Sequence, residues 1–433
     1  MTARRWNTRS RLTDRGIAFA VLGVLLGIAA FALGIDQLRY VGMLLILLPL
    51  VNLTWTALSR LDVDVARAVR PERVQAGEAV DVDLTLLNRA RYRLGGVRAQ
   101  DRFPWQPHHS TFLPVGTLEP LTESARIAYR LVPPRRGVFR LGPLSLDHDD
   151  PFRLSTVRST VEGLTSLVVT PQLVELVDVE LPLVERDGPA RATRPTGAAD
   201  FADAQTRGYR DGDPLRRVHW RASARRGELM VREDEHQSFP EARIVLDTLA
   251  SGYRDLSSAF PDRSGSSLSP ESASFEWVLR LTASLALHLR SAGYLVTVVE
   301  SGGRGQTVLG ADDQVGTKPS DFLSDLAALH LADDRGRPGS GLNGDRPSDS
   351  LPRLVFAVVG RPADLTGEWL DAQRAGHERP VAFVVSPRRE SADDGAVAAA
   401  LATRGWNCFA ARATDDPSLA WRGFARSLGS ARV

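Results

Sequence analysis

Residues 242–247 read ARIVLD, residues 274–292 read SFEWVLRLTASLALHLRSA, and residues 294–300 read YLVTVVE. The first and last segments are short apolar runs of strand length. The middle segment repeats its large apolar residues at spacings of three or four, at Val278, Leu281, Leu285 and Leu289. That spacing is typical of a helix with one buried face. The order strand, helix, strand predicts two parallel strands joined by a crossover helix.

The same alternation continues toward the C-terminus. Further strands are expected at 306–309, 354–359, 380–385 and 407–411. Further helices are expected at 320–331, 364–374, 396–404 and 419–428. This pattern predicts a doubly wound parallel sheet, with helices on both faces, over residues 241–433. Two insertions rich in Ser, Gly, Asp and Pro, 254–272 and 333–352, are expected to be loops.

Upstream of the α/β pattern the hydrophobic period changes to two. Val80, Val82, Leu84 and Leu86 alternate with polar residues, and residues 125–131 repeat the pattern. Such segments read as strands with one buried face, and turn dipeptides separate them. Residues 61–185 are therefore expected to form a β-sandwich-like domain. Residues 186–240 then connect it to the α/β domain.

Two uncharged stretches lie near the start of the chain. Residues 16–34 read GIAFAVLGVLLGIAAFALG, and residues 40–58 read YVGMLLILLPLVNLTWTAL. At roughly 1.5 Å per residue each spans about 28 Å, close to the hydrocarbon thickness of a bilayer. They predict a transmembrane helical hairpin over residues 16–60. A cleaved signal peptide is the alternative, but the first run is longer than a typical signal and a second span follows at once.

Arginine placement predicts the sidedness of this hairpin. Five arginines precede the first span within the basic segment 1–15, four follow the second between Arg60 and Arg73, and the loop between the spans has only Arg39. The positive-inside rule places both ends in the cytoplasm. We therefore expect a two-pass protein of the cell membrane, in contact with lipid, with the bulk of its chain cytoplasmic.

Composition limits the other function classes. The chain has 433 residues, of which 43% are hydrophobic and 24% are charged, which is normal for a globular protein. Its 54 basic and 52 acidic residues give a formal charge of +2, which provides no reason to expect nucleic-acid binding. The single cysteine, Cys408, excludes an internal disulfide and a multi-cysteine zinc site.

The most distinctive stretch lies in the connector, at residues 207–232, and we call it the signature stretch. It reads RGYRDGDPLRRVHWRASARRGELMVR. Asp211-Gly212-Asp213-Pro214 forms a tight turn that presents carboxylates, and the arginines around it can bind them through two-point hydrogen bonds. Tyr209 and Trp220 offer flat faces on which guanidinium groups stack.

This stretch resembles the family known as domain of unknown function 58. The matching positions are a Tyr-x-x-Gly-Asp turn, Arg-x-Val-x-Trp, Ala-Arg and Leu-x-Val-Arg, that is, Tyr209, Gly212, Asp213, Arg217, Trp220, Ala224, Arg225 and Arg232. Upstream, the segments 135–143, 150–152 and 167–171 also look like family motifs. His219 stands where the family usually has an acidic residue, which argues against an essential role for that position.

The resemblance implies a fold and a setting. The C-terminal part is expected to be similar to von Willebrand factor type A domains. Family members occur beside MoxR-type AAA ATPases and other membrane proteins of the bacterial inner membrane. This implies an interaction or assembly protein, with an AAA ATPase as the protein partner. Independently of the resemblance, the density of ion-pairing residues in the signature stretch predicts that its Arg/Asp cluster locks the β-sandwich-like domain to the α/β domain.

The resemblance also raises the question of a metal site. Type A domains often bind Mg²⁺ through an Asp-x-Ser-x-Ser loop after the first strand. Here Asp247 and Ser251 fit that loop, and Leu249 replaces the middle serine. The strand ending at Val359 continues into Gly360-Arg361, without the second aspartate expected there. Too few oxygen ligands converge for the six that Mg²⁺ takes, so we expect no cofactor. The alternative is a metal-dependent hydrolase that uses Asp247 and Ser251 and retains Mg²⁺.

No catalytic constellation is evident elsewhere. The signature stretch contains acid and base types but no serine or cysteine clearly paired with a base. The run Asp147-His148-Asp149-Asp150 lacks metal-ligand spacing and is expected to be an exposed turn. We therefore expect a protein that is not an enzyme. A purely structural membrane factor without a dedicated partner is the remaining interpretation.

Overall fold

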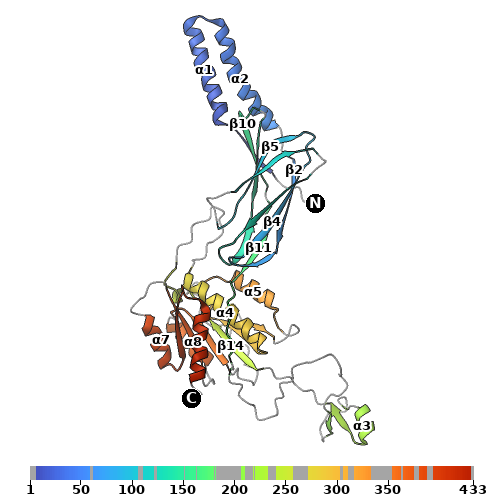
Figure 1. Cartoon of the computed structure of the whole chain (residues 1–433), viewed down its shortest axis with the longest axis vertical. Helices are drawn as coiled ribbons and strands as arrows, with labels where there is room; N and C mark the ends of the chain where they lie inside the picture. Colours follow the sequence, from blue (N-terminus) through green and yellow to red (C-terminus); the bar gives the residue numbers. More distant parts are fainter. Residues whose placement is uncertain are drawn as a thin grey trace.

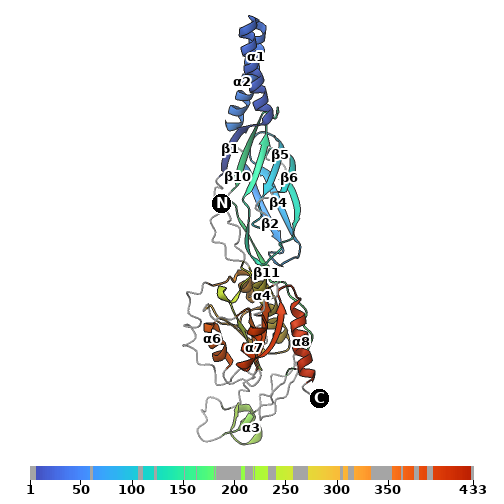
Figure 2. The same cartoon turned by 90° about the vertical axis from the view of Figure 1, so that its left-hand side faces the viewer.

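The computed structural model shows an elongated molecule, with two long helices at one end (Figures 1 and 2). A part built of strands follows, then an α/β part, and a small unit containing helix α3 (Trp220–Arg226) lies at the opposite end. The structure describes residues 6–58, 62–105, 111–120, 124–150, 152–161, 163–179, 181, 206–209, 218, 220–232, 240–256, 272–302, 306–310, 316–332, 354–361, 364–374, 380–387 and 394–430.

The two N-terminal helices are α1 (Asp14–Leu33) and α2 (Asp36–Leu58). Both are long and apolar enough to cross a membrane. Gly34 ends α1 in the left-handed conformation, with φ of 68°, and so permits the tight turn into α2. Gly23 and Gly42 let the helices approach closely, because a Cβ on either would lie 2.8 Å from the other's carbonyl oxygen.

The strands that follow form three sheets. A five-stranded antiparallel sheet has the order β1-β10-β9-β5-β6, and its strands are β1 (Trp6–Leu12), β5 (Leu94–Asp101), β6 (Thr111–Leu118), β9 (Leu144–Asp149) and β10 (Ser155–Val161). A three-stranded antiparallel sheet consists of β2 (Val63–Arg70), β4 (Val80–Asn88) and β7 (Ser124–Leu131), in the order β2-β4-β7. The third sheet has the order β3-β11-β8, from β3 (Arg73–Gln75), β8 (Gly137–Leu141) and β11 (Thr165–Thr170).

We call these sheets together the β-rich part. Leu84 and Leu86 of β4 are buried, and they share one apolar core with Leu146 of β9 and Val157 of β10. The polar residues between them face away, as the period of two requires. The first two sheets therefore pack against each other through the side chains that the alternation predicts to be buried.

One strand of this part was not expected. Residues 6–12 belong to the segment predicted as a basic N-terminus, but they form β1, which pairs antiparallel with β10. The register joins Arg9 to Arg158 and Leu12 to Ser155. Residues 8–11 are exposed, so backbone hydrogen bonds hold this strand and its side chains carry no apolar alternation. The β-rich part thus begins before the helical hairpin and continues after it.

The α/β part is built on a six-stranded sheet with the order β16-β15-β14-β17-β18-β19. The strands are β14 (Glu241–Leu246), β15 (Leu295–Glu300), β16 (Gln306–Leu309), β17 (Leu354–Val359), β18 (Val381–Ser386) and β19 (Asn407–Arg412). All neighbours pair in parallel except β15 and β16, which are antiparallel. The sequence-based strand positions agree with these bounds to within one residue.

Both faces of this sheet carry apolar side chains. Ile244 of β14 packs with the helices α4 (Ala273–Ser291), α5 (Pro319–Ala328) and α8 (Pro417–Ser430). Val245, the next residue, packs in a second core with α6 (Asp364–Arg374) and α7 (Asp394–Thr403). Successive strand residues point to opposite faces, so each face of β14 contributes to a different core.

Candidate functional site

Polar side chains converge where β14 and β15 end. Asp247 follows β14 and is fully buried, and its Oδ1 accepts hydrogen bonds from Ser301 Oγ at 2.7 Å and from the Leu249 backbone at 3.1 Å. Ser301 follows β15, and its Oγ also accepts from the Thr248 backbone at 2.9 Å. The carboxyl ends of neighbouring parallel strands thus meet at Asp247, as expected for such a sheet.

Glycines let the backbone approach this aspartate closely. A Cβ on Gly252 would lie 2.5 Å from Asp247 Oδ2, and a Cβ on Gly360 would collide with the carbonyl of Gly252. Arg361 N donates to that carbonyl at 2.7 Å, which joins the loop after β14 to the end of β17. The hydroxyl of Tyr253 donates to the Asp247 carbonyl at 2.6 Å. Burial raises the pKa of Tyr253 well above its usual range, and Asp247 and Asp255 raise it further.

The residues present do not fit a divalent cation. Asp247 is buried, whereas Ser251, its expected co-ligand, lies exposed in the short helical turn Ala250–Gly252. Leu249 is buried and its side chain has no ligand atom, and the residue after Gly360 at the end of β17 is Arg361, which is a cation. In the part of the chain that the structure describes, no three His, Cys, Asp or Glu side chains converge. Mg²⁺ takes about six oxygen ligands, and the described residues of this loop do not supply that number.

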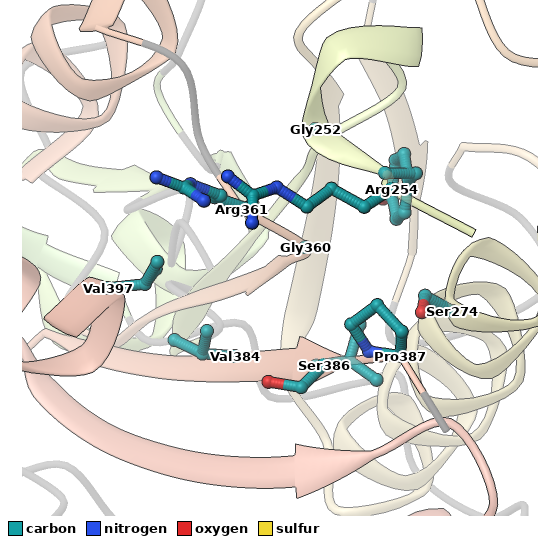
Figure 3. A pocket seen from close by; sticks show the side chains of 11 residues that line it. Gly252, Arg254, Ser274, Gly360, Arg361, Val384, Ser386, Pro387 and Val397 are labelled. Carbon is teal, nitrogen blue, oxygen red and sulfur yellow. The ribbon is translucent and has the colours of Figure 1, made fainter. Parts of the chain in front are cut away.

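A small pocket lies near the ends of these strands, and we call it the strand-end pocket (Figure 3). It is formed where β14, β17 and β18 end and where α4 begins. Its lining residues are Gly252, Tyr253, Arg254, Ser274, Gly360, Arg361, Val384, Val385, Ser386, Pro387 and Val397. The charged side chains in this lining are two arginines, Arg254 and Arg361. The predicted motifs gave no role to Arg254, Ser274 or Ser386.

The signature stretch lies elsewhere. Strands β12 (Thr206–Gly208) and β13 (Met230–Arg232) pair antiparallel beside α3, and Tyr209 N donates to Leu229 O at 2.8 Å. This small unit lies beyond the α/β part, at the end of the molecule away from the β-rich part, in both views (Figures 1 and 2). The described residues of the stretch therefore do not lie between the two parts, where the sequence predicted them to be.

The individual residues of the stretch separate into buried and exposed groups. Val218, Met230 and Val231 are buried within the unit. Trp220 is 66% exposed, and Ala224 and Arg225 are also exposed. Gly212, Asp213 and Arg217 lie outside the described residues, as does the side chain of Arg232, so their predicted roles stay predictions.

The contact between the β-rich and α/β parts centres on Arg136, in the turn between β7 and β8. We call this contact the junction. The Arg136 side chain is only 7% exposed, and its Nη1 donates to three carbonyls at the end of α5: Leu326 at 2.9 Å, Ala327 at 3.2 Å and Leu329 at 2.8 Å. The last carbonyls of a helix lack partners within it, and the negative end of its dipole attracts a cation. Arg136 therefore acts as the cap of a helix in the other part.

Two more contacts of Arg136 reach α4. Its Nη2 lies 3.1 Å from Glu276 Oε1, and its guanidinium carbon lies 5.3 Å from the centre of the Phe275 ring. Phe275 packs edge-on against Tyr253 at 5.3 Å, and Tyr253 lines the strand-end pocket. Burial lowers the pKa of Arg136, and the Glu276 carboxylate opposes that shift. The junction and the pocket are thus linked through two aromatic rings.

The segment after β11 completes the junction. Val174 N donates to Ser284 Oγ of α4 at 3.0 Å, and Trp421 Nε1 of α8 donates to Val177 O at 2.7 Å. Leu173, Leu176 and Val179 pack against the core of the α/β part. Sequence reasoning found the Arg135-Arg136-Gly137 motif but assigned it no role. An arginine pair before a strand does not by itself indicate which arginine becomes buried.

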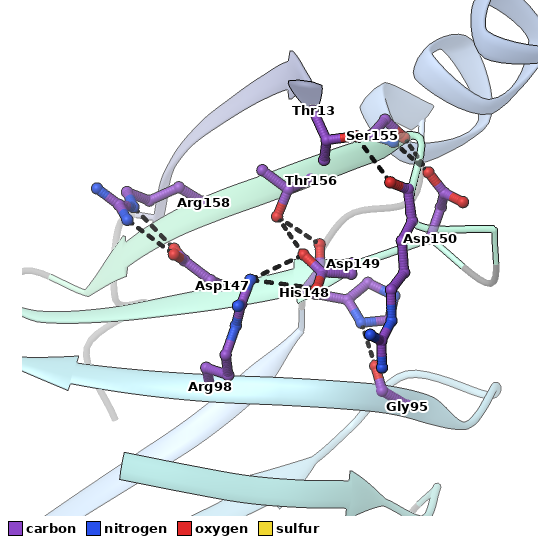
Figure 4. Close-up of polar contacts among 11 residues, drawn as sticks. Thr13, Gly95, Arg98, Asp147, His148, Asp149, Asp150, Ser155, Thr156 and Arg158 are labelled. Atoms are coloured by element: carbon purple, nitrogen blue, oxygen red, sulfur yellow. Dashed lines mark hydrogen bonds and ion pairs between the residues drawn. The ribbon is translucent and has the colours of Figure 1, made fainter. Parts of the chain in front are cut away.

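The acidic run 147–150 is not an exposed turn. Asp147 belongs to β9 and forms a two-point ion pair with Arg158 of β10, at 2.7 Å for each contact (Figure 4). Asp149 accepts from Arg98 and from Thr156. Asp150 is buried and accepts from Ser155 Oγ at 2.8 Å, and Ser155 Oγ in turn lies 3.1 Å from Thr56 Oγ1 of α2. Cross-strand pairs therefore occupy these carboxylates, and the run ties the sheet to the helical hairpin.

His148 in the same run contacts a backbone carbonyl and no metal-ligand group. Its Nδ1 lies 2.8 Å from Gly95 O. Burial lowers the pKa of His148, while Asp149 and Asp150 partly oppose the shift. The histidine is therefore a structural side chain of the β-rich part.

Comparisons with known proteins give little beyond this geometry. No curated protein matches the chain. Solved structures that match in part include a CARDB domain from Pyrococcus furiosus, with 11% identity, 25% of this chain and 88% of that chain covered, and a TM-score of 0.18. Another is the sporulation control protein Spo0M from Bacillus subtilis, with 12% identity and a TM-score of 0.16. That match covers 25% of this chain and 49% of Spo0M. TM-scores this low support no argument about fold or function.

One comparison concerns the signature stretch directly. Residues 205–309 match the model of a family described as "Protein of unknown function DUF58". The matched segment begins just before β12 and ends with β16, so it contains the small distal unit and the first three strands of the six-stranded sheet in chain order. Asp247, Arg254 and Ser274 fall within it.

Proposed function

We propose that this chain is a membrane-anchored interaction protein that presents its signature stretch to a protein partner. The observation that carries the proposal is the exposure of Trp220 at the end of the molecule away from the two apolar helices. Exposed tryptophan beside arginines is typical of protein interfaces, where both residue types dominate binding energy. Arg221, Arg225 and Arg226 lie on the same short helix α3 as Trp220 and are exposed. The partner surface is therefore apolar at its centre and acidic at its rim.

The hairpin anchors the protein in the cell membrane as a two-pass segment, with the bulk of the chain in the cytoplasm. The arginine distribution supports this sidedness. The chain path also supports it. Strand β1 precedes the hairpin and β2 follows it, and both belong to the β-rich part, so the two ends of the hairpin lie on the same side of the membrane. Contact with membrane lipid follows from the exposed apolar side chains of α1 and α2.

The proposal also assigns a fold and a role to the β-rich part and to the α/β part. The β-rich part acts as a β-sandwich spacer, supported by the apolar core that its two larger sheets share. The α/β part acts as a doubly wound, von Willebrand factor type A-like domain, supported by parallel pairing and by cores on both faces of the sheet. Its role is docking without catalysis, and the family resemblance suggests a MoxR-type AAA ATPase as partner.

A pull-down of the tagged full-length chain from native membranes in mild detergent tests the proposal. Trp220→Ala is expected to abolish recovery of the specific partner. Phe152→Ala is the matched control, because Phe152 is a similarly exposed aromatic, at 62%, on the β-rich part. Equal partner recovery with both variants, or recovery of this chain alone from the wild type, would contradict the proposal.

A further inference from the structure

We propose that the turn between β9 and β10 contacts the membrane surface, with Phe152 in the headgroup layer and with Arg153 and Arg15 on the phosphate of an anionic phospholipid. This inference rests on the proposed membrane anchoring, and it names the lipid class and the site of a contact outside the hairpin. It starts from two observations. Phe152 is 62% exposed, and hydrogen bonds join the residues after it to the start of α1.

These contacts fix the level of the turn relative to the hairpin. Thr13, the N-cap of α1, donates through its Oγ1 to Arg153 O at 2.7 Å and through its backbone N to Leu154 O at 2.9 Å. A Cβ on Gly16, where the uncharged span begins, would collide with the Leu154 carbonyl. A bilayer has a headgroup layer of about 5–8 Å on each side of its hydrocarbon. The turn therefore lies at the level of that layer.

The turn is also held from the side of α2. Ser155, directly after it, has its Oγ 3.1 Å from Thr56 Oγ1 of α2. The buried carboxylate of Asp150 accepts from Phe152 N at 2.7 Å and from Ser155 Oγ at 2.8 Å. The backbone around Phe152 is thus fixed beside both helices before a lipid arrives. A fixed site favours binding, because less conformational freedom is lost.

The backbone of Arg153 has an uncommon conformation for this residue type. Its φ is 56°, in the left-handed region that glycine adopts at lower cost. Its N donates to Asp150 O at 2.9 Å, and its carbonyl accepts the Thr13 hydroxyl, so both backbone groups hold it there. An arginine at a position suited to glycine indicates a use for its exposed side chain beyond the turn itself.

The exposed charges near the hairpin ends favour an anion. Arg11, Arg15 and Arg153 are exposed, and none of them forms an ion pair among the residues that the structure describes. Exposed Asp14 and Asp62 offset only part of their charge. Guanidinium groups bind phosphate oxygens through two-point hydrogen bonds, and basic residues at a membrane surface attract anionic lipids. Aromatic rings are also favoured at this level.

Spin-labelled lipids test the inference on the full-length protein in phosphatidylcholine vesicles. Electron spin resonance measures how strongly spin-labelled phosphatidylglycerol associates with the protein, relative to spin-labelled phosphatidylcholine. The wild type is expected to favour phosphatidylglycerol several-fold, and the double variant Arg15→Gln, Arg153→Gln is expected to lose most of that preference. No preference in the wild type, or an equal preference in the double variant, would overturn the inference.

Arg102→Gln is the matched control for the double variant. Arg102 is an exposed arginine that follows β5, whose last residues pair with the start of β9, whereas the turn follows the end of β9. It therefore lies at the end of the β-rich part away from the hairpin. Its substitution is expected to leave the lipid preference unchanged, and a loss equal to that of the double variant would overturn the inference.

A second measurement locates residue 152 without depending on lipid charge. A nitroxide is attached to Phe152→Cys in a Cys408→Ala background, and its collisions with oxygen are compared with its collisions with a water-soluble nickel chelate. Oxygen, which concentrates in the bilayer, is expected to dominate. Leu164→Cys is the control, because Leu164 is 56% exposed beyond the other end of β10, and nickel is expected to dominate there. Dominance of nickel at both positions would overturn the inference.

Alkaline carbonate extraction of the same vesicles separates this inference from the proposed anchoring. If the wild-type chain is extracted, the anchoring and the turn contact both fail. If the chain stays embedded but shows no lipid preference and a nickel-accessible residue 152, the turn contact fails and the anchoring stands. Phe152→Ala leaves the hairpin intact, so this variant is expected to stay embedded.

Discussion

The junction and the signature stretch are both rich in arginine, yet they behave in opposite ways. At the junction one arginine, Arg136, is buried and contacts three helix-end carbonyls, a carboxylate and an aromatic ring. In the signature stretch Arg221, Arg225 and Arg226 lie exposed on a short helix at the far end of the molecule. A single buried arginine joins the two parts, whereas the described arginines of the more highly charged stretch are exposed.

The difference shows what decides whether an arginine is structural. Burying a guanidinium is costly unless its donors find acceptors and its charge finds a partner. The end of α5 supplies unpaired carbonyls and a negative dipole, so one arginine is enough there. Density of charge along the sequence does not reveal such acceptors, because Leu326 lies 190 residues downstream of Arg136.

The largest effect is expected from Arg136→Ala. The substitution leaves three carbonyls without their donor and removes the partner of Glu276, and we expect a loss of unfolding free energy of about 3 kcal/mol or more. Urea unfolding of the full-length protein in nanodiscs measures it.

Arg73→Ala is the matched control for that variant. Arg73 also bridges the two parts, but its ion pair with Asp321 is half exposed on both sides. Exposed pairs contribute about 0–1 kcal/mol. Equal losses for Arg73→Ala and Arg136→Ala would remove the special role assigned to Arg136.

The next effect concerns the pocket that adjoins the junction. In Gly252→Ala the new Cβ lies 2.5 Å from Asp247 Oδ2 in a fully buried site, and we expect a loss of about 1–3 kcal/mol from overpacking. Gly395→Ala is the control, because a Cβ there meets nothing within 4 Å. Thermal unfolding of both variants measures the difference in stability between them. An unchanged unfolding midpoint for Gly252→Ala would contradict the close approach of Gly252 to the Asp247 carboxylate.

A smaller effect is expected from pH, because His288 of α4 lies beside Asp178, in the segment after β11 that contributes to the junction. His288 lies 4.0 Å from Asp178 and packs edge-on against Trp421, and burial lowers its pKa. The unfolded chain then binds more protons than the folded chain below about pH 6.5, so stability falls as pH drops through that value. His148 contributes with the same sign, since burial lowers its pKa too.

Thermal midpoints between about pH 7.5 and pH 5, on either side of the ordinary histidine pKa, measure this dependence. His288→Gln is expected to show a flatter profile than the wild type. A steeper profile in the variant would mean that His288 is stabilised in its charged form, which is the opposite of the expected sign.

The smallest effect on stability is expected from the signature stretch. Trp220→Ala removes a side chain that is two-thirds exposed, and surface substitutions of this kind change stability by about 0.5 kcal/mol or less. The same unfolding experiment measures it. A loss comparable with that of Arg136→Ala would show that Trp220 is buried in the membrane-bound protein.

Much of the element pattern was predictable from the sequence. The strand at 354–359 and the helix at 364–374 follow local periodicity and agree with the structure in full. The two apolar spans are helices α1 and α2, each long and apolar enough to cross a membrane. The alternation at Val80–Leu86 placed the buried face of β4 correctly.

The elements that escaped prediction depend on distant partners. Strand β1 has exposed side chains and is held by backbone pairing with β10, about 150 residues away. The carboxylates of residues 147–150 are paired across strands, so their local sequence resembles an exposed turn. The strand-end pocket combines residues from separate segments of the chain, and of its lining residues the metal-loop analysis singled out Arg361 in advance.

Hydrogen-exchange mass spectrometry of the full-length protein in nanodiscs tests the central claim, that Arg136, rather than the described residues of the signature stretch, joins the two parts. We predict that Arg136→Ala lowers protection in α5 and in β8 and β11, whereas Trp220→Ala leaves these elements protected as in the wild type. Unchanged protection in Arg136→Ala, or the same loss in Trp220→Ala, would contradict the account.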